Sequence, residues 1–247
     1  MRVKGAVALV TGANGGMGRA FVQALTKAGA AKVYSGVRNA GADVEPGSIR
    51  APLDVTDPKA VAAASAACGD VSILINNAGA LHAQPFLAAP SMDAARAEME
   101  TNYFGTLSMC RAFAPVLGRN GGGALINMLS VVSWFTFPLS GSQCASKAAQ
   151  FSLTNGLRIE LRAQKTQVVG VFAGFIDTAM ARGFAGVPKT APATIAQRVI
   201  EGVERGEEEI LADERAVAVR ETLRREPMAI YEDMQRLWDA RDKERAS

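Results

Sequence analysis

Gln143 and Lys147 are two polar residues whose spacing suggests chemistry. They are four residues apart, so on a helix they share one face and both side chains can point into the same site. A lysine ammonium lowers the pKa of an acid beside it and helps that acid to give up a proton. A glutamine amide can donate a hydrogen bond to a polarised oxygen, but it cannot give up a proton itself.

A glycine-rich turn near the N-terminus contains the residues needed to hold a phosphate group. It reads Thr11-Gly12-Ala13-Asn14-Gly15-Gly16-Met17-Gly18 and joins the first expected strand to the first expected helix. Glycines at 12, 16 and 18 let the backbone turn sharply and approach a pyrophosphate, whose charge is held by amide N–H groups at the helix N-terminus. The turn predicts a nucleotide site.

The elements that must position these residues alternate along the chain. Short apolar runs rich in β-branched residues predict strands, and the longer amphipathic stretches between them predict helices. This alternation is typical of an α/β fold with a doubly wound, mostly parallel sheet of about seven strands and helices on both faces. The expected strands are Ala6–Thr11, Lys32–Val37, Ile49–Leu53, Val71–Asn76, Ala124–Met128, Gln167–Phe172 and Glu209–Leu211.

The last part of the chain, 213–247, is densely charged, with apolar residues at roughly helical spacing. We expect an amphipathic helical tail, broken near Pro227 and packed on its own domain. A flap over the site or a contact with a partner subunit is the alternative. With no linker visible, residues 1–247 are expected to form one domain.

Composition and charge argue against several classes of protein. The net charge of +3 comes from 27 basic and 24 acidic residues without a basic run, so nucleic acid is not an expected partner. The three cysteines and the single histidine, His82, lack metal-site or disulfide spacing. The first apolar run is too short for a membrane span. We expect a cytoplasmic protein with a small-molecule ligand, no metal and no membrane partner.

Several motifs together resemble those of the short-chain dehydrogenase/reductase family. The turn fits Thr-Gly-x-x-x-Gly-x-Gly, Asn76-Asn77-Ala78-Gly79 ends the fourth strand, and Gly174-Phe175-Ile176-Asp177-Thr178 follows the sixth. Ala173 stands where the family usually has proline. The resemblance implies a three-layer Rossmann-like fold and a nicotinamide cofactor. The cofactor-binding residues that it implies are Gly12, Asn14, Gly16, Met17, Gly18, Arg38, Asp54, Val55, Asn76, Ala78, Gly79, Lys147, Gly174, Ile176 and Thr178.

The end of the second strand bears on the choice of cofactor. An acid there would bind the adenosine ribose hydroxyls and repel a 2′-phosphate. The segment Tyr34-Ser35-Gly36-Val37-Arg38-Asn39 has no acid. Arg38 lies where NADP-using members of the family place a guanidinium, which can form charge-assisted hydrogen bonds to the phosphate. NADP(H) is therefore favoured, and a solvated surface charge is the alternative for Arg38.

The resemblance also implies four catalytic positions: Asn102, Ser130, Gln143 and Lys147. Asn102 would support a proton-relay water, Ser130 would bind the substrate oxygen, and Lys147 would hold the nicotinamide ribose. Ordinary members have a tyrosine at the position of Gln143. Hydride transfer to a ketone builds an alkoxide that needs a proton, and losing the acid costs about 10²- to 10⁴-fold in rate.

Three other side chains are candidates for the missing acid. Cys144 lies three residues before Lys147, whose ammonium would lower its thiol pKa, and His82 follows Gly79 in a loop that borders the substrate in this family. Tyr103 is next to Asn102 but would face about 100° away on a helix. A buried, inert cysteine and a surface histidine are the alternatives.

These observations predict an NADP(H)-dependent short-chain oxidoreductase with an atypical site that reduces a hydrophobic carbonyl or imine. An imine arrives already protonated as an iminium and so needs less acid assistance. A nucleotide-binding scaffold or sensor without turnover, and a Tyr-to-Gln knockout of an ordinary alcohol dehydrogenase, are the alternatives. We expect a homodimer or homotetramer, paired through the helices near 91–116 and 142–161. The residues expected to make the substrate site hydrophobic are Trp134, Phe135, Phe137, Met180, Phe184 and Val187.

Overall fold

Seven strands form one sheet in the computed structural model, which describes residues 1–39 and 41–246 and side chains as far as residue 240. The strand order is β3-β2-β1-β4-β5-β6-β7, and every neighbouring pair is parallel. The expectation of a parallel sheet of about seven strands is confirmed. The strands are β1 Val7–Thr11, β2 Lys32–Val37, β3 Ile49–Pro52, β4 Ile73–Asn76, β5 Ala124–Met128, β6 Gln167–Phe172 and β7 Glu209–Leu211.

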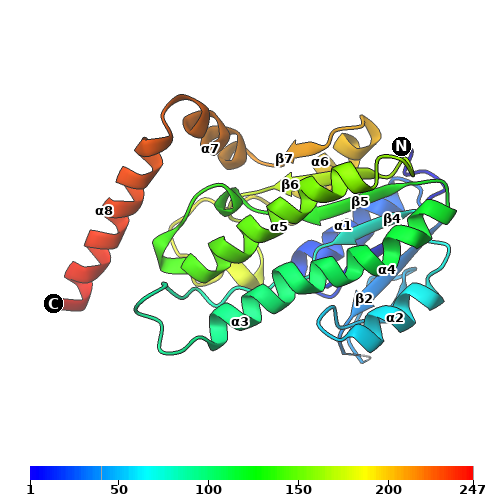
Figure 1. Ribbon diagram of the computed structural model, residues 1–247, viewed down its shortest axis with the longest axis horizontal. Coiled ribbons are helices and arrows are strands. Elements are labelled where there is room, and N and C mark those ends of the chain that lie inside the picture. Colours follow the sequence, from blue (N-terminus) through cyan, green and yellow to red (C-terminus); the bar gives the residue numbers. More distant parts are fainter. Residues whose placement is uncertain (40, 247) are drawn as a thin grey trace.

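Helices cover both faces of the sheet and make three layers (Figure 1). One face carries α1 Gly16–Lys27 and α6 Pro192–Glu204, which pack on each other. The other carries α2 Pro58–Ala67, α4 Thr106–Arg119 and α5 Gly141–Glu160. All residues of β4 and β5 are buried, as expected for parallel strands between two helical layers.

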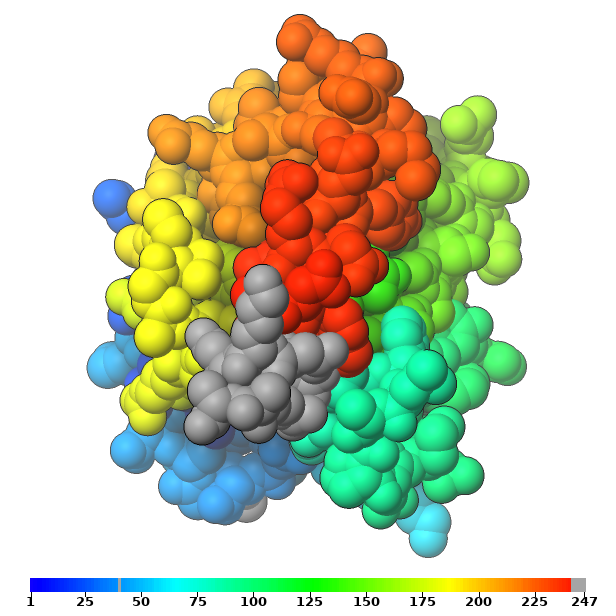
Figure 2. Space-filling model, turned by 90° about the vertical axis from the view of Figure 1, so that its left-hand side faces the viewer, coloured from blue at the N-terminus to red at the C-terminus, as the bar shows by residue number. Residues whose placement is uncertain are grey.

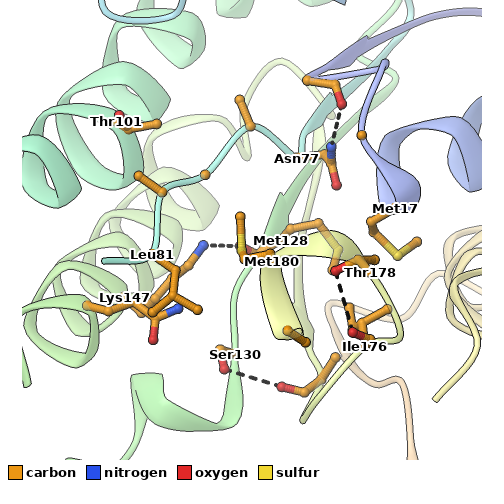
Figure 3. Close-up of a pocket in the computed structure, with 18 of the residues that line it drawn as sticks. Met17, Asn77, Leu81, Thr101, Met128, Ser130, Lys147, Ile176, Thr178 and Met180 are labelled. Atoms are coloured by element: carbon orange, nitrogen blue, oxygen red, sulfur yellow. Dashed lines mark hydrogen bonds between the residues drawn. The ribbon is translucent and has the colours of Figure 1, made fainter. Parts of the chain in front are cut away.

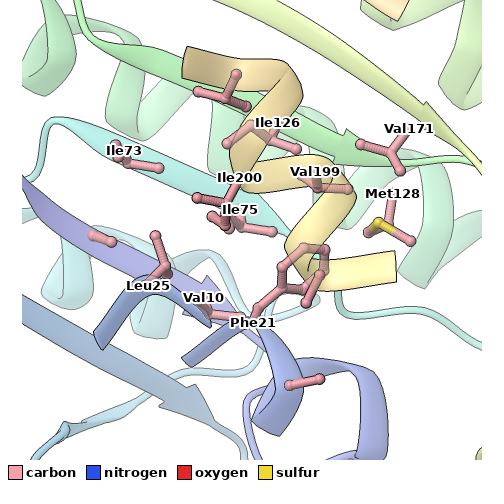
Figure 4. Close-up of a cluster of buried hydrophobic side chains, with 14 of the residues drawn as sticks. Val10, Phe21, Leu25, Ile73, Ile75, Ile126, Met128, Val171, Val199 and Ile200 are labelled. Atoms are coloured by element: carbon pink, nitrogen blue, oxygen red, sulfur yellow. The ribbon is translucent and has the colours of Figure 1, made fainter. Parts of the chain in front are cut away.

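The core between α1, α6 and the sheet shows how the apolar periods of the sequence become packing. Phe21 and Leu25 of α1 meet Val199 and Ile200 of α6 above the strands (Figure 4). All four are on the buried faces of amphipathic helices, where residues three or four apart point to the same side. This packing holds the N-terminus of α1 over the carboxyl end of β1.

A long irregular helix leads into α4. It begins as α3 Asp93–Met99 and continues through a π-helical segment, Glu100–Gly105, labelled η1. Such a segment is rare and often lies at a functional site. Three short 3₁₀ turns complete the carboxyl edge of the sheet: η2 Val131–Ser133, η3 Pro138–Ser140 and η4 Ala179–Ala181.

The charged tail forms two helices, α7 Glu214–Arg225 and α8 Pro227–Ala246, and Pro227 is the first residue of α8. α8 lies across one face of the molecule (Figure 2). Its Ile230 is buried in a small apolar cluster with Phe135, while Met228 and Tyr231 are exposed. Among the described residues, none of the helices combines the length and apolar character that a membrane crossing requires.

Candidate active site

A cleft of about 590 Å³ opens at the carboxyl ends of the central strands. It lies where the chain, after running to β3 at one edge, returns to place β4 on the other side of β1; ligands bind at such switch points in α/β sheets. Met17, Asn77, Ser130, Lys147, Thr178 and Met180 surround it (Figure 3). Of the residues expected to bind cofactor, all but Asn76 line this cleft.

The glycine turn has the geometry of an anion site. Gly12 has φ +63°, a conformation that side chains disfavour, and a Cβ on Gly18 would lie only 2.2 Å from the carbonyl oxygen of Gly12. The first turn of α1 contains no acidic residue, and its N-cap is Gly15. The backbone N–H groups of that turn have no partner within the helix and so can hold a phosphate.

Thr11 and Asn77 join the glycine turn to the end of β4. The Thr11 Oγ1 atom accepts hydrogen bonds from the backbone N–H groups of Asn77 and Ala78, both at 2.9 Å. The Asn77 side-chain amide donates to the Thr11 carbonyl oxygen at 2.9 Å. The two halves of the cleft floor are thereby held together.

The expectation that Asn76 lines the cleft is wrong. Asn76 is only 2% exposed, and its Nδ2 group donates to Asn127 Oδ1 on β5 at 2.8 Å, inside the protein. Asn77 lines the cleft instead. Successive residues of a strand point to opposite faces, so one of the two asparagines had to point away from the other.

Arg38 lies just beyond the end of β2, exposed, on the cleft wall. Among the residues whose side chains the structure describes, 1–39 and 41–240, it has no ion-pair or hydrogen-bond partner. Glu45, an acid in the loop that follows, is paired with other residues: it accepts a hydrogen bond from Gln23 and forms an ion pair with Arg19 at 3.1 Å. These contacts hold the pKa of the Glu45 carboxyl below its usual value. The guanidinium of Arg38 is thus available to an anion in the cleft.

Lys147 is 8% exposed and carries its charge at the inner end of the cleft. Its Nζ donates to the Met128 carbonyl oxygen at 2.7 Å and to Gln150 Oε1 at 2.8 Å. Burial lowers the pKa of the Lys147 ammonium to about 8. A neutral amine still has two N–H bonds for these two acceptors, so the surroundings accommodate both protonation states.

Gln143 and Ser130 present an amide and a hydroxyl to the same cleft. Gln143, in the first turn of α5, accepts a hydrogen bond from Ser140 Oγ at 3.4 Å through its Oε1 atom. Its Nε2 group has no partner in the part of the chain that the structure describes. Ser130 caps η2 and donates to the Ala173 carbonyl oxygen at 3.3 Å. Two hydrogen-bond donors therefore border the space beside Lys147.

Comparison with known proteins identifies the family. The profile of the short chain dehydrogenase family matches residues 6–185. This chain belongs to that family. It is 32% identical over 195 residues to "Dehydrogenase/reductase SDR family member 7B" of Bos taurus, an alignment that covers 71% of this chain and 59% of the relative. Against "Sorbitol dehydrogenase" of Cereibacter sphaeroides the identity is 33% over 191 residues, or 72% of this chain and 73% of the relative.

Two solved structures are similar to this short chain dehydrogenase over most of its length. A short chain dehydrogenase from Burkholderia cenocepacia J2315 in complex with NADP has a TM-score of 0.90 and 41% identity, covering 95% of this chain and 99% of that one. A short chain dehydrogenase/reductase from Burkholderia phymatum in complex with NAD has a TM-score of 0.77 and 26% identity, covering 94% and 96%. Both structural relatives thus hold a nicotinamide cofactor.

Asn102 does not line the cleft of this dehydrogenase, contrary to its expected place in the site. It is 0% exposed, within η1. Its Nδ2 group donates to the Ala80 carbonyl oxygen at 3.0 Å and to Ser146 Oγ at 2.9 Å, while its Oδ1 atom accepts from the Ala80 N–H at 2.8 Å. Both amide hydrogens are used, so the side chain fastens the loop after β4 to α5.

Glu98 makes a second hydrogen-bonded link between the loop after β4 and α5, which the sequence did not reveal. This fully buried carboxylate of α3 accepts from the His82 backbone N–H at 2.6 Å and from Ser142 Oγ at 2.5 Å. It ties the same loop to the first turn of α5, one residue before Gln143. The dehydrogenase therefore positions Gln143 through buried polar groups that never reach the cleft themselves.

None of the three candidate replacements for the missing acid lines the cleft. The Cys144 thiol is buried against the backbone of Phe137, and burial raises its pKa to about 11. The expectation that Lys147 would lower it is wrong: loss of solvation is the largest cause of the shift, and Lys147 is not among its causes. His82 is exposed, and Tyr103 also lies away from the lining. Lys147, which lies on the same helix as Gln143 and lines the cleft with it, is a remaining candidate for the acid.

The outer end of the cleft is apolar. Phe135, Phe137, Met180 and Phe184 line it. Val187 is not part of the lining, and neither is Trp134, which stacks on Phe172 at 4.1 Å in the core behind. Leu81, Val132, Ser140 and Arg215 are among the lining residues that the sequence did not single out.

Proposed function

We propose that this short chain dehydrogenase uses NADP(H) to reduce a hydrophobic carbonyl or imine compound. The observation that carries the proposal is one continuous cleft with three parts: a glycine turn suited to a pyrophosphate, a buried lysine beside two hydrogen-bond donors, and an apolar outer chamber. The family supplies the class of chemistry, since relatives hold a nicotinamide cofactor. The choice of NADP rests on Arg38 and on the NADP complex of the more similar structure.

The chain's own residues suit the oxygen and proton of the reaction. NADPH, when bound, supplies the hydride. The Gln143 Nε2 group can donate a hydrogen bond to the carbonyl oxygen as its negative charge grows, and so can the Ser130 hydroxyl once it turns from the Ala173 carbonyl oxygen. Lys147, directly or through one water molecule, can then give a proton: its N–H bond breaks, the O–H bond of the alcohol forms, and the amine regains a proton from solvent.

Gln143 also favours a second substrate class, the imines. An iminium nitrogen enters with its proton already in place, so hydride transfer leaves a neutral amine and needs no acid. The side-chain oxygen of Gln143 can accept a hydrogen bond from that N–H if Ser140 turns away, since Ser140 Oγ is its one hydrogen-bond donor among the described residues.

The test is NADPH oxidation by the purified protein with a panel of hydrophobic ketones, aldehydes and cyclic imines, beside cofactor binding measured by fluorescence. We expect turnover with at least one class. Tight NADPH binding with no turnover across the panel would contradict the proposal and favour a nucleotide-binding scaffold or a disabled alcohol dehydrogenase.

Replacing Arg38 with Asp should weaken NADPH binding at least tenfold more than NADH binding. The guanidinium would lose a charge-assisted contact with the 2′-phosphate, and the new carboxylate would repel that phosphate and accept from the ribose hydroxyls of NADH. Dissociation constants of both cofactors, by fluorescence, check it. Replacing Arg182, which is exposed and outside the cleft lining, with Asp is the matched control and should change neither. Equal affinities of the unmodified protein for the two cofactors would refute the assignment.

We also propose a homodimer or homotetramer. The support is the outer face of α5, where Ala145 and Ala148 are exposed and small enough for another helix to approach closely. Light scattering at micromolar concentration that gave a monomer would contradict it.

A further inference from the structure

Arg215 brings a positive charge to the apolar outer end of the cleft. It is the second residue of α7 and comes from the far end of the chain, yet it lines the same cleft as Phe175 and Met180. Its guanidinium carbon lies 5.1 Å from the centre of the Phe175 ring. The Phe175 ring in turn lies 5.0 Å from that of Phe184. An apolar wall therefore ends in a cation.

The position of Arg215 is fixed by its neighbours. A Cβ on Gly174 would lie 2.6 Å from Arg215 Cδ, so the side chain fits because residue 174 is glycine. Asp213 holds the start of α7 in place: its carboxylate accepts from the Gly174 N–H at 2.8 Å and from the Ala216 N–H at 2.7 Å. Both oxygens of this nearby acid are thus bound to backbone N–H groups.

Arg215 differs from Arg220 and Arg225 of the same helix. Arg220 pairs with Glu209 at 2.9 Å and Arg225 with Glu221 at 2.6 Å. Within the described residues, Arg215 makes neither an ion pair nor a hydrogen bond. Asp233 of α8 shares a shallow hollow with it, but that carboxylate is paired with Arg236.

The charges of the cleft single out the group that Arg215 would bind. Among the residues whose side chains the structure describes, Asp54 is the one acidic residue of the lining, and it lies at the loop after β3, where the family resemblance places the adenine. Arg38 is needed at that end, and Lys147 is buried at the inner end. A planar guanidinium on an aromatic ring, next to an apolar chamber, matches a ligand with an apolar body and one terminal carboxylate.

We propose that Arg215 binds a substrate carboxylate, so that the substrates of this dehydrogenase are hydrophobic oxo or imino acids whose reacting carbon is separated from the carboxylate by an apolar spacer. This inference rests on the proposed function, because a bound acid is a substrate only if the protein reduces it. Binding of a carboxylate by Arg215 does not itself depend on turnover.

The test measures binding first, with the full chain and saturating NADP⁺. Calorimetry with 4-phenylbutanoate and with its neutral amide compares two ligands of the same shape. We expect the unmodified protein to prefer the carboxylate by about tenfold or more, the scale of a charge-assisted contact. Arg215→Gln should abolish that preference, Arg215→Lys should keep part of it, and Arg182→Gln, the control at an exposed arginine outside the lining, should keep all of it.

Two results would overturn the inference: equal affinities for acid and amide in the unmodified protein, or a preference that survives in a folded Arg215→Gln protein. Turnover then separates this inference from the proposed function. NADPH-dependent reduction of 4-oxo-4-phenylbutanoate is compared with that of its methyl ester. Carboxylate binding through Arg215 without any reduction would support the carboxylate site and contradict the proposed reductase function. Equal reduction of acid and ester, unaffected by Arg215→Gln, would support the reductase function and contradict the carboxylate site.

Discussion

Gln143→Tyr is expected to raise NADPH-dependent ketone reduction by a hundredfold or more. Residue 143 lines the cleft in the first turn of α5, and Ser130 and Lys147 line the same cleft, so a phenol there would meet the groups it needs. A positioned acid is worth about 10²- to 10⁴-fold in rate. The measurement is kcat/KM for a hydrophobic ketone in both proteins, with the dissociation constant of NADPH measured alongside.

The matched control is Gln143→Phe, which adds the same ring without the hydroxyl and should give no gain. If ketone reduction by Gln143→Tyr stays unchanged or falls while NADPH binding is normal, the site is built around glutamine. Imine reduction by the unmodified protein would then be the favoured activity, because an iminium needs no acid from residue 143.

Ketone reduction by the unmodified protein should fall as the pH rises through about 8. Burial penalises the Lys147 ammonium, so its pKa is lowered from 10.5 to about 8. Reduction consumes the protonated form, which predominates below that pKa and is lost above it. Above it, kcat/KM should decrease by about tenfold per pH unit. Reduction of a preformed iminium should not show this decrease in kcat/KM at high pH, since no proton from Lys147 is needed.

Lys147→Met provides the second arm of that test. It keeps a long unbranched side chain but removes the proton, and ketone reduction should drop by about 10²-fold or more. Because the lysine is also expected to hold the nicotinamide ribose, rates are compared at saturating NADPH. A pH profile of the unmodified protein that is flat from pH 6 to 10 would show that the proton comes from elsewhere.

Much of the cofactor side of the cleft was predictable from local sequence. The glycines of the first turn are required by backbone conformation and close contact within eight residues, as the positive φ of Gly12 and the closeness of Gly18 to the Gly12 carbonyl show. The seven strands follow from short β-branched runs that parallel pairing buries on both faces. Such features depend on neighbours in the chain, so the sequence alone determines them.

The tertiary structure decided what depends on distant residues. Asn76 turned inward because Asn127, 51 residues away, pairs with it, and Asn102 left the cleft wall to hold Ala80 and Ser146. The pKa values of Cys144 and Lys147 shift mainly because packing removes water, which no spacing in sequence reveals. Arg215 reached the cleft only because β7 and α7 close the sheet beside Gly174. Side-chain direction, burial and charge environment are sums over contacts made by the whole fold, and for that reason they appear only once the chain has folded.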